Sequence, residues 1–455
     1  MADKLFSEFD PVSAKAFKQK IQYDLKGAEY NSLLWHSPEG IDVKPFYHSE
    51  DVKNIVKIPN HPGNWNIAQE IFILDPKVSA QTANDAISKG AEALFLKADE
   101  KFKIPDLFNN LENISIPLYF NLWFLEPDFA NALVEEAGKR GIVVFLNCDI
   151  IGNLARSGNW FMGLEPDFKA LGQVLYKNPT EKVISIDSGL YQNAGANMVQ
   201  QLVYALAHAN EYLNYFGEKL KDSLLTFRVS TGGNYFFEIA KIRALRLLYS
   251  ALAKEYQLPE TCHIIATPTR RNKVIYDYNT NMLRTTTECM SAVLGGADTI
   301  LNLPYDALYH KTNDFGERIS RNQLLVLKEE SYFDKVSNPA EGSYYIESLT
   351  QQLAEKSLKL FKELEAGGGF LKHLKAGILQ RKIKESAAKE QELFDSGKKI
   401  LLGTNKYPNP DDRMKDDLEL YPFVKTKPRK TLIEPIIPRR LAEKLEQERL
   451  GNEAP

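Results

Sequence analysis

Short apolar runs alternate with longer helical patterns between Gln69 and Pro304. Eight of these runs are rich in β-branched and aromatic residues, and continuous apolar runs are typical of strands buried on both faces, as a parallel sheet requires. The runs cover residues 70–74, 93–96, 117–120, 142–146, 183–186, 225–229, 263–266 and 299–303.

The segments between these runs carry helical patterns, clearest at residues 79–89, 129–140, 194–215, 235–256 and 281–294. Eight strand–helix units within about 240 residues predict a (β/α)8 barrel, an α/β fold. A doubly wound open sheet is the main alternative. No run is followed by a GxGxxG turn, so a dinucleotide site is not indicated.

The chain before the barrel, residues 1–62, has an early amphipathic stretch. Phe9, Val12, Phe17 and Ile21 recur at roughly helical spacing, with Asp10 or Ser13 placed to cap the helix. The rest of this arm has too little apolar patterning to fold alone. We expect it to pack on the barrel or on a partner chain.

The barrel is predicted to span residues 63–342, followed by a helical extension (343–402) and a C-terminal tail (403–455). One helix face in the extension is marked by Leu349, Leu353, Leu360, Phe361 and Leu364. The glycines at 367–369 end that helix, and one charged helix is expected over residues 370–393. The tail is rich in Pro, Lys and Asp, has a last helical piece at 439–450, and is suited to docking.

Composition narrows the class of protein. The chain is 44% hydrophobic and 26% charged with a net charge of -3, so nothing in its charge favours nucleic acid or an anionic membrane. Its start, MADKLFSEFD, lacks the features of a signal peptide, and no apolar run approaches the ~20 residues that span a bilayer. Cys148, Cys262 and Cys289 lie far apart without CxxC spacing, which fits a reducing cytoplasm.

Motifs that carry chemistry are missing: the sequence has no HExxH, Walker A, GxSxG or DxDxDG element. The seven histidines, none at metal-ligand spacing, are His36, His48, His61, His208, His263, His310 and His373. We expect them to be structural or solvent-facing. His263 opens the seventh run, which in a barrel lies at the face associated with stability rather than catalysis.

The carboxyl ends of the predicted strands carry polar residues, where barrel enzymes place their catalytic groups. These residues are Asp75, Lys97, Asn121, Asn147, Asp149, Asp187, Arg228, Ser230, Thr267 and Asn302. Polar strand ends are also ordinary in any barrel, and we favour that interpretation. Arg270 and Arg271, after the seventh run, are placed either to grip a phosphate or carboxylate or to form a basic interface loop.

Several collinear segments resemble the methylmalonyl-CoA mutase family, and together they span nearly the whole chain. They are DLKGAEYNSL (24–33), PEGIDVKP (38–45), FFEIAKIRALR (236–246), residues 281–297, RISRNQ (318–323), NPAEGSYYIESLT (338–350) and GTNKY (403–407). In catalytic members a DxHxxG histidine ligates cobalt. No such motif occurs here, the nearest pair being His373 and Gly377, so the resemblance implies that this chain does not bind cobalamin.

Substrate-binding elements of the family are also replaced. The RGxYxTMY loop gives way to IPNHPGNWN (58–66), and SGWSLT gives way to TRRNKV (269–274). A gapless match puts Leu190 at the family's substrate histidine after the fifth strand, and Asn302 stands at the histidine after the eighth. Leucine cannot donate a hydrogen bond or a proton.

The barrel lining differs as well. The resemblance implies that substrate threads a small, polar barrel axis in catalytic members, whereas the strand runs here carry Phe72, Phe95, Tyr119, Phe120, Phe145 and Phe227. If one alternate set of these aromatics points inward, the interior is filled and no tunnel remains.

The resemblance therefore implies a non-catalytic small subunit, with no catalytic, cofactor-binding or metal residues and no activity alone. Its partner would be a large subunit that holds adenosylcobalamin and interconverts (R)-methylmalonyl-CoA and succinyl-CoA; isolated chains are either monomers or homodimers. One alternative is the substrate-binding barrel of a split acyl-CoA mutase that uses a separate cobalamin-binding chain. A third interpretation, an unrelated barrel enzyme, would need a catalytic group such as Asp187 with Arg228.

Overall fold

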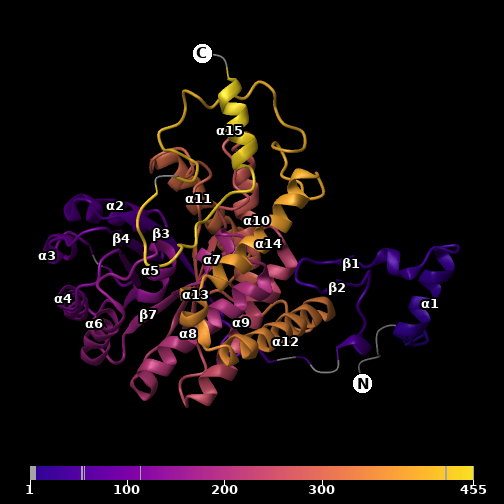
Figure 1. Ribbon diagram of the computed structural model, residues 1–455, viewed down its shortest axis with the longest axis horizontal. Helices are drawn as coiled ribbons and strands as arrows, with labels where there is room; N and C mark the ends of the chain where they lie inside the picture. The colour runs from indigo at the N-terminus through magenta and orange to yellow at the C-terminus, as the bar shows by residue number, and fades with distance from the viewer. Residues whose placement is uncertain (1–6, 53–54, 56, 113, 426–427, 454–455) are drawn as a thin grey trace.

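The computed structural model describes residues 7–52, 55, 57–112, 114–425 and 428–453. Its centre is a closed barrel of eight parallel strands, in which β10 pairs with both β9 and β3 (Figure 1). The strands are β3 (Asn66–Phe72), β4 (Ala93–Ala98), β5 (Leu118–Leu122), β6 (Val144–Cys148), β7 (Lys182–Asp187), β8 (Thr226–Thr231), β9 (His263–Pro268) and β10 (Thr299–Leu301). The predicted barrel is confirmed, and the open sheet is wrong.

Each predicted run overlaps one strand, but the first strand begins earlier than expected. The apolar pattern predicts a run over residues 70–74, whereas β3 starts at Asn66, whose backbone N–H donates to Asp298 O across 2.9 Å. Pairing of β3 with β10 on one side and β4 on the other holds this polar start in the sheet. Such pairing uses backbone groups, so a strand can include polar positions such as Asn66 and Gln69 that interrupt its apolar pattern.

Helices surround the barrel. They are α2 (Pro76–Ser88), α3 (Ile104–Phe108), α4 (Pro127–Gly138), α5 (Ile150–Ser157), α6 (Leu164–Lys177), α7 (Gly189–Asn193), α8 (Met198–Phe216), η3 (Gly217–Leu220), α9 (Tyr235–Glu255), α10 (Thr280–Gly295), α11 (Asp314–Leu325) and η4 (Val326–Glu330). Asp75 caps α2 by accepting from the backbone N–H groups of Lys77 (2.8 Å) and Val78 (3.2 Å), and Pro76 fits the first turn.

The predicted helical extension is present as α12 (Tyr344–Ala366), α13 (Gly369–Lys375) and α14 (Ile378–Asp395), and α12 packs along α8 and α9 (Figure 1). The single helix expected over residues 370–393 is wrong. The chain breaks at Ala376 and Gly377, and Gly377 has a φ of 71°, a left-handed conformation that glycine adopts without strain and that ends a helix.

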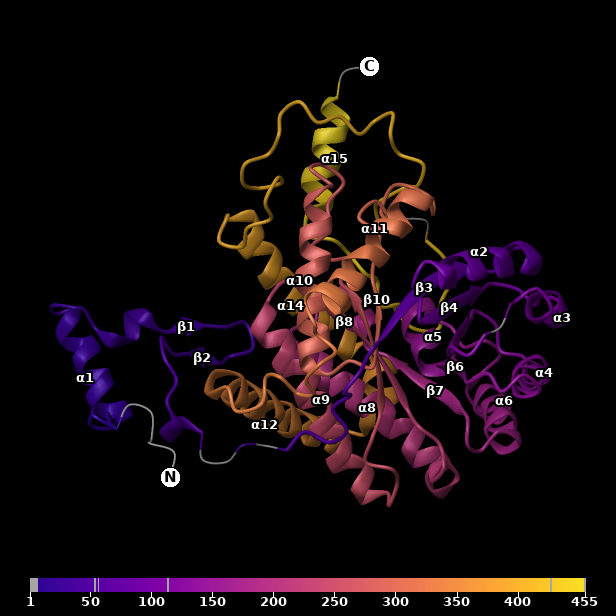
Figure 2. The ribbon, with the colours of Figure 1, turned by 180° about the vertical axis from the view of Figure 1, so that it is seen from behind.

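The N-terminal arm extends sideways from the barrel (Figures 1 and 2). Its elements are α1 (Ala14–Asp24), η1 (Tyr30–Leu33), β1 (Trp35–His36), β2 (Asp42–Val43) and η2 (Ser49–Asp51). Ser13 caps α1 by accepting from Ala16 N, as predicted, yet no residue of α1 is buried. The arm meets its own barrel through the hairpin, where the Trp35 ring lies 5.6 Å from that of Phe237 on α9.

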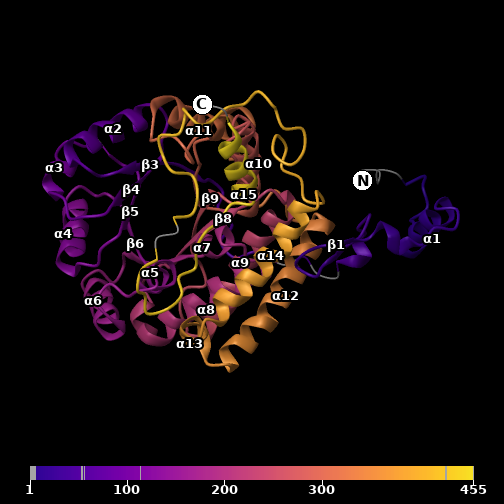
Figure 3. The same cartoon turned by 45° about the horizontal axis from the view of Figure 1, so that its top comes forward.

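The C-terminal tail folds back over the carboxyl ends of the strands and ends in α15 (Glu443–Asn452) (Figure 3). Backbone hydrogen bonds fasten it: Ile436 N donates to Ala155 O (2.8 Å) and Leu441 N donates to Arg271 O (2.9 Å). The predicted final helix is confirmed, and the tail docks on its own barrel. In the part of the chain that is described, no helix has the length and apolar character to cross a membrane.

Candidate functional site

Aromatic side chains fill the middle of the barrel. The Tyr119 hydroxyl on β5 lies 3.0 Å from His263 Nε2 on β9 and 2.8 Å from Thr299 Oγ1 on β10. Because β5 is not adjacent to β9 or β10, these contacts run across the barrel interior. Tyr119 is 0% exposed, so the axis is occupied at this level.

Two further rings stack on Tyr119. The ring of Phe145 lies 4.4 Å from that of Tyr119 and 4.5 Å from that of His263, and Phe95 lies 6.3 Å from Tyr119 on the other side. The three rings of Phe95, Tyr119 and Phe145 form one buried cluster with Ala68, Ala93, Ile265 and Leu301. Of the six aromatic residues in the predicted strand runs, Phe95, Tyr119 and Phe145 point inward. Phe120 and Phe227 belong to the layer between strands and helices, and Phe72 is half-exposed.

The rings of Phe95, Tyr119, Phe145 and His263 form an aromatic plug in the barrel. His263 lies at the start of β9, the position expected for a stabilising residue. Burial lowers its pKa to about 4, although Asp298 nearby opposes the shift. A neutral ring fits its buried place beside the rings of Tyr119 and Phe145.

The polar ring predicted at the mouth is only partly brought together. Lys97 forms an ion pair with Glu70 (2.6 Å), and Arg228 lies 3.4 Å from Asn121 Oδ1 and 3.7 Å from the Asp187 carboxylate. These groups cap the aromatic plug, since the Arg228 guanidinium sits 5.2 Å from the centre of the Phe95 ring. Asp187 and Arg228 therefore belong to a layer of paired charges over the plug.

Other members of that ring have structural partners elsewhere. Asp75 caps α2, and Ser230 Oγ accepts from Asn193 Nδ2 (3.0 Å). Asn302 donates to Ser320 O (2.8 Å) and to Gln323 Oε1 (3.0 Å), so it ties β10 to α11. Asn147 is buried, with no hydrogen-bond partner for its amide among the described residues.

Asp149 belongs to a buried network beside the mouth. His208 Nε2 lies 2.9 Å from Asp149 Oδ1, and the Tyr212 hydroxyl donates to the same carboxylate (2.9 Å). Backbone N–H groups of Gly152 and Asp187 also donate to it. Although burial opposes ionisation, the charge and hydrogen bond of His208 and these donors hold the Asp149 pKa at about 2. Spacing along the chain gave no signal for this network.

Leu190 lies in α7, directly after β7, and is 4% exposed within the main core. It is therefore packed among apolar side chains and offers no polar atom to the mouth.

The charged residues of FFEIAKIRALR hold elements together. Arg243 donates to Glu347 (2.6 Å) and to Asn338, both in the NPAEGSYYIESLT segment. Arg246 donates to Gly296 O (2.6 Å) and Asp298 (2.7 Å). Two segments distant in sequence that carry the family resemblance are thus joined by buried charges.

Three of the remaining histidines contact carboxylate or carbonyl oxygens of the chain. His36 contacts Asp42 (2.6 Å), His310 contacts Asp306 (3.2 Å), and His373 Nδ1 lies 2.8 Å from Gly369 O. Among the described residues, no group of three or more His, Cys, Asp or Glu side chains is arranged to hold a metal ion.

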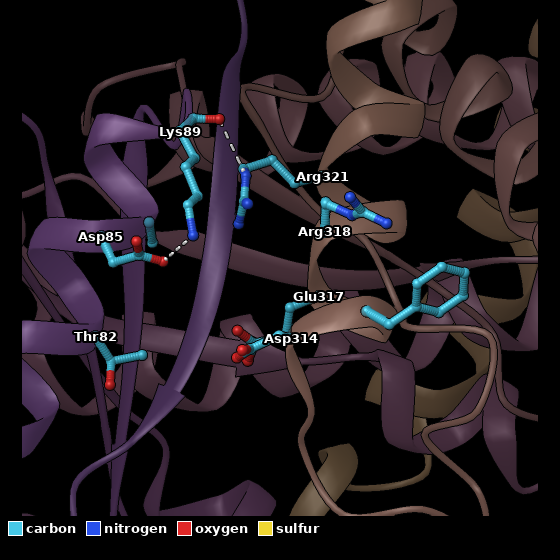
Figure 4. Close-up of a pocket in the computed structure, with 9 residues that line it drawn as sticks. Thr82, Asp85, Lys89, Asp314, Glu317, Arg318 and Arg321 are labelled. Carbon is cyan, nitrogen blue, oxygen red and sulfur yellow. Dashed lines mark hydrogen bonds and ion pairs between the residues drawn. The ribbon is translucent and has the colours of Figure 1, made fainter.

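A small pocket of about 250 Å³ lies between α2 and α11, away from the mouth (Figure 4). Arg321 donates to Lys89 O (3.1 Å), and Lys89 pairs with Asp85 (2.7 Å). Glu317 lines the same pocket, and burial, assisted by Asp314, raises its pKa to about 7 against the opposing charge of Arg321. The sequence gave no signal for this pocket.

Comparison of the sequence with known protein sequences indicates one family. The family model described as methylmalonyl-CoA mutase matches residues 131–446. A methylmalonyl-CoA mutase small subunit of Porphyromonas gingivalis is 34% identical over 447 residues, which cover 90% of this chain and 71% of that protein.

Two further relatives are also named as methylmalonyl-CoA mutases. A methylmalonyl-CoA mutase of Cereibacter sphaeroides is 29% identical, with 86% of this chain and 64% of that protein covered. A methylmalonyl-CoA mutase small subunit of Streptomyces virginiae is 28% identical, with 81% and 65% covered. The chain thus spans somewhat less than two thirds of these two relatives. The family match and the 34% identity show that this chain belongs to the methylmalonyl-CoA mutase family.

Proposed function

We propose that this chain is the non-catalytic small subunit of an adenosylcobalamin-dependent methylmalonyl-CoA mutase in the cytoplasm. The partner is a large subunit that binds the cofactor and interconverts (R)-methylmalonyl-CoA and succinyl-CoA. Adenosylcobalamin supplies the radical chemistry when bound, and this chain supports the chain that holds it.

The observation that carries the proposal is the filled barrel axis. Tyr119 reaches across the interior to His263, and Phe145 stacks on both rings. An acyl-CoA that had to thread this axis would need to displace a packed, hydrogen-bonded layer, which is costly in a close-packed interior. Leu190 supports the same proposal, because a buried leucine cannot act as an acid or base.

The N-terminal arm is the contact with the large subunit in this proposal. It projects from the barrel and leaves several large apolar side chains uncovered: Val12 is 58% exposed and Tyr23 is 79% exposed. Large apolar side chains left exposed on a projecting arm favour burial against a partner, and a stable pair buries roughly 2,000 Å² or more.

Activity of a reconstituted pair tests the proposal. This chain is expected to form no succinyl-CoA alone with adenosylcobalamin, and to copurify with the large mutase chain of the same organism as an active complex. Turnover by this chain with a free-standing cobalamin-binding protein would instead identify it as the barrel of a split acyl-CoA mutase.

Substitutions separate the arm from the rest of the surface. Val12→Glu with Tyr23→Glu is expected to weaken copurification at least tenfold. Leu74→Glu with Leu432→Glu, at residues that are 87% and 71% exposed outside the arm, serves as the matched control. Equal loss of pairing in both variants would contradict the arm as the contact.

A further inference from the structure

The tail and the barrel mouth line a large cavity that is open to solvent. Its volume is about 940 Å³, and its wall combines barrel loops (Arg156, Asn193, Arg270, Arg271) with tail residues that lie within 420–425 and 428–443. Figure 3 shows the tail crossing this end of the barrel, where the loops after the strands gather. In barrels of this type, ligands bind at the carboxyl ends of the strands.

Positive charge dominates the wall. Among its lining residues, Glu443 is the single carboxylate, against Arg156, Arg270, Arg271, Lys425, Arg429, Arg439 and Arg440. Three of these arginines are already paired, Arg156 with Asp187, Arg271 with Glu390 and Arg440 with Glu446. Within the described chain, Arg270, Arg429, Arg439 and Lys425 have no carboxylate partner, although Arg429 donates to Ser157 O (2.7 Å). The charges of these residues are therefore available to an anion in the cavity.

Asn193 anchors the backbone of two of these cations, Arg270 and Arg439. The backbone N–H of Arg270 donates to Asn193 Oδ1 (2.8 Å), and the backbone N–H of Arg439 donates to Asn193 O (3.0 Å). One residue thus anchors an arginine from the barrel loop and another from the tail. Arg271 strengthens the junction, because its guanidinium donates to Arg439 O (2.9 Å).

The other part of the wall is aromatic and apolar. Tyr421 is 62% exposed and its ring packs edge-on against Phe423 at 5.5 Å, beside Pro422, Ile437 and Pro438. An exposed ring held by a second ring offers a stacking surface for a flat heterocycle. The cavity therefore offers cations for phosphate groups and an aromatic ring for a base, the two features that binding of a nucleotide requires.

We propose that this cavity binds a nucleoside phosphate, with Arg270 and Arg439 on the phosphates and Tyr421 under the base. Its source is either a free nucleotide or the nucleotide end of coenzyme A, which share this chemistry. The site lies on the chain itself and does not depend on pairing with a large subunit, so its failure and the failure of the proposed function are distinguishable.

Calorimetric titration of the full chain with ADP, ATP, coenzyme A and pyrophosphate tests the site. The wild-type chain is expected to bind ADP and ATP. Arg270→Gln with Arg439→Gln is expected to weaken binding at least tenfold, since two charge-assisted contacts are lost. Arg318→Gln with Arg381→Gln, which removes the same charge elsewhere, is expected to bind as the wild type does; thermal melting checks that every variant folds.

Tyr421→Ala separates base recognition from phosphate recognition. It is expected to weaken ADP binding and to leave pyrophosphate binding unchanged. Coenzyme A binding competitively with ADP identifies the coenzyme as an accepted ligand, and ADP binding without coenzyme A identifies a free nucleotide. Absence of ADP binding at millimolar concentration, equal affinity in the Arg270/Arg439 variant, or pyrophosphate binding as tightly as ADP would overturn the proposal.

Discussion

The Tyr119 hydroxyl on β5 lies 3.0 Å from Nε2 of His263 on β9, so a hydrogen bond bridges the barrel. Thr299 on β10 is a second partner at 2.8 Å. All three groups are buried, and an unpaired polar atom there costs free energy. The plug is therefore a hydrogen-bonded layer as well as an apolar one.

Tyr119→Phe removes this hydroxyl without opening a large cavity. We expect a loss of about 1–2 kcal/mol in the free energy of unfolding, because His263 and Thr299 lose a buried partner. Urea denaturation measures the change, with Tyr407→Phe as the control, since Tyr407 is 75% exposed. A Tyr119→Phe chain as stable as the wild type would mean that water or a local shift replaces the hydroxyl.

The pH dependence of stability reports on His263. Its pKa is about 4 in the folded chain against an ordinary value of 6.5, because burial disfavours the charged ring. Between these two pH values the unfolded chain binds the extra proton, so this group makes the folded chain less stable as pH falls from 6.5 towards 4. The difference of about 2.5 between these two pKa values corresponds to about 3 kcal/mol in the free energy of unfolding.

His263→Gln keeps a polar side chain but cannot titrate. The difference in unfolding free energy between wild type and His263→Gln, measured at pH 7.5 and pH 4.5, is expected to move against the wild type at the lower pH. A difference that stays constant over this range would show that the ring is not held neutral.

The barrel could be predicted because its strands correspond to apolar runs whose length and spacing are typical of a (β/α)8 barrel. The inward set of aromatics could not, since Phe95 and Phe120 look alike until strand register assigns each a face. The α13–α14 break was missed because Gly377 stands inside a charged helical pattern. The cavity under the tail could not be predicted, because its wall brings together Arg270 and Arg439, which are 169 positions apart in the sequence.

Glu317 gives a pH dependence of the opposite sign. Burial raises its pKa from 4.5 to about 7 in the folded chain, so the folded chain binds the extra proton between these values. Stability from this group is present below pH 4.5 and is lost as pH rises towards 7. Since Glu317 is partly exposed, we expect about 1–2 kcal/mol.

Glu317→Gln removes this titration while keeping the shape of the side chain. The variant is expected to gain stability relative to the wild type at pH 7.5 and to match it at pH 4.5. Asp85→Asn, in the same pocket, is the control for removing a carboxylate. An identical pH profile in the Glu317→Gln chain and the wild type would contradict the raised pKa.

The Arg243–Glu347 pair fastens α9 to the helical extension. Arg243 Nη2 donates to Glu347 Oε1 (2.6 Å), and both side chains are at most 1% exposed. Gly342 N also donates to Glu347 Oε1 (3.1 Å), so this carboxylate holds the loop before α12 as well. Glu347→Gln is expected to cost about 3–5 kcal/mol, because it leaves the guanidinium buried without a counter-charge.

Denaturant unfolding of Glu347→Gln measures this loss. The matched control is Glu385→Gln, which breaks the exposed Lys382–Glu385 pair on α14 (2.8 Å) and is expected to change little, because water screens such pairs. Replacing both partners, Arg243→Met with Glu347→Leu, is expected to recover part of the stability, because no buried charge then lacks a partner. If this double variant were less stable than Glu347→Gln, hydrogen bonding of Arg243 to Asn338 and Thr350 would be its main contribution.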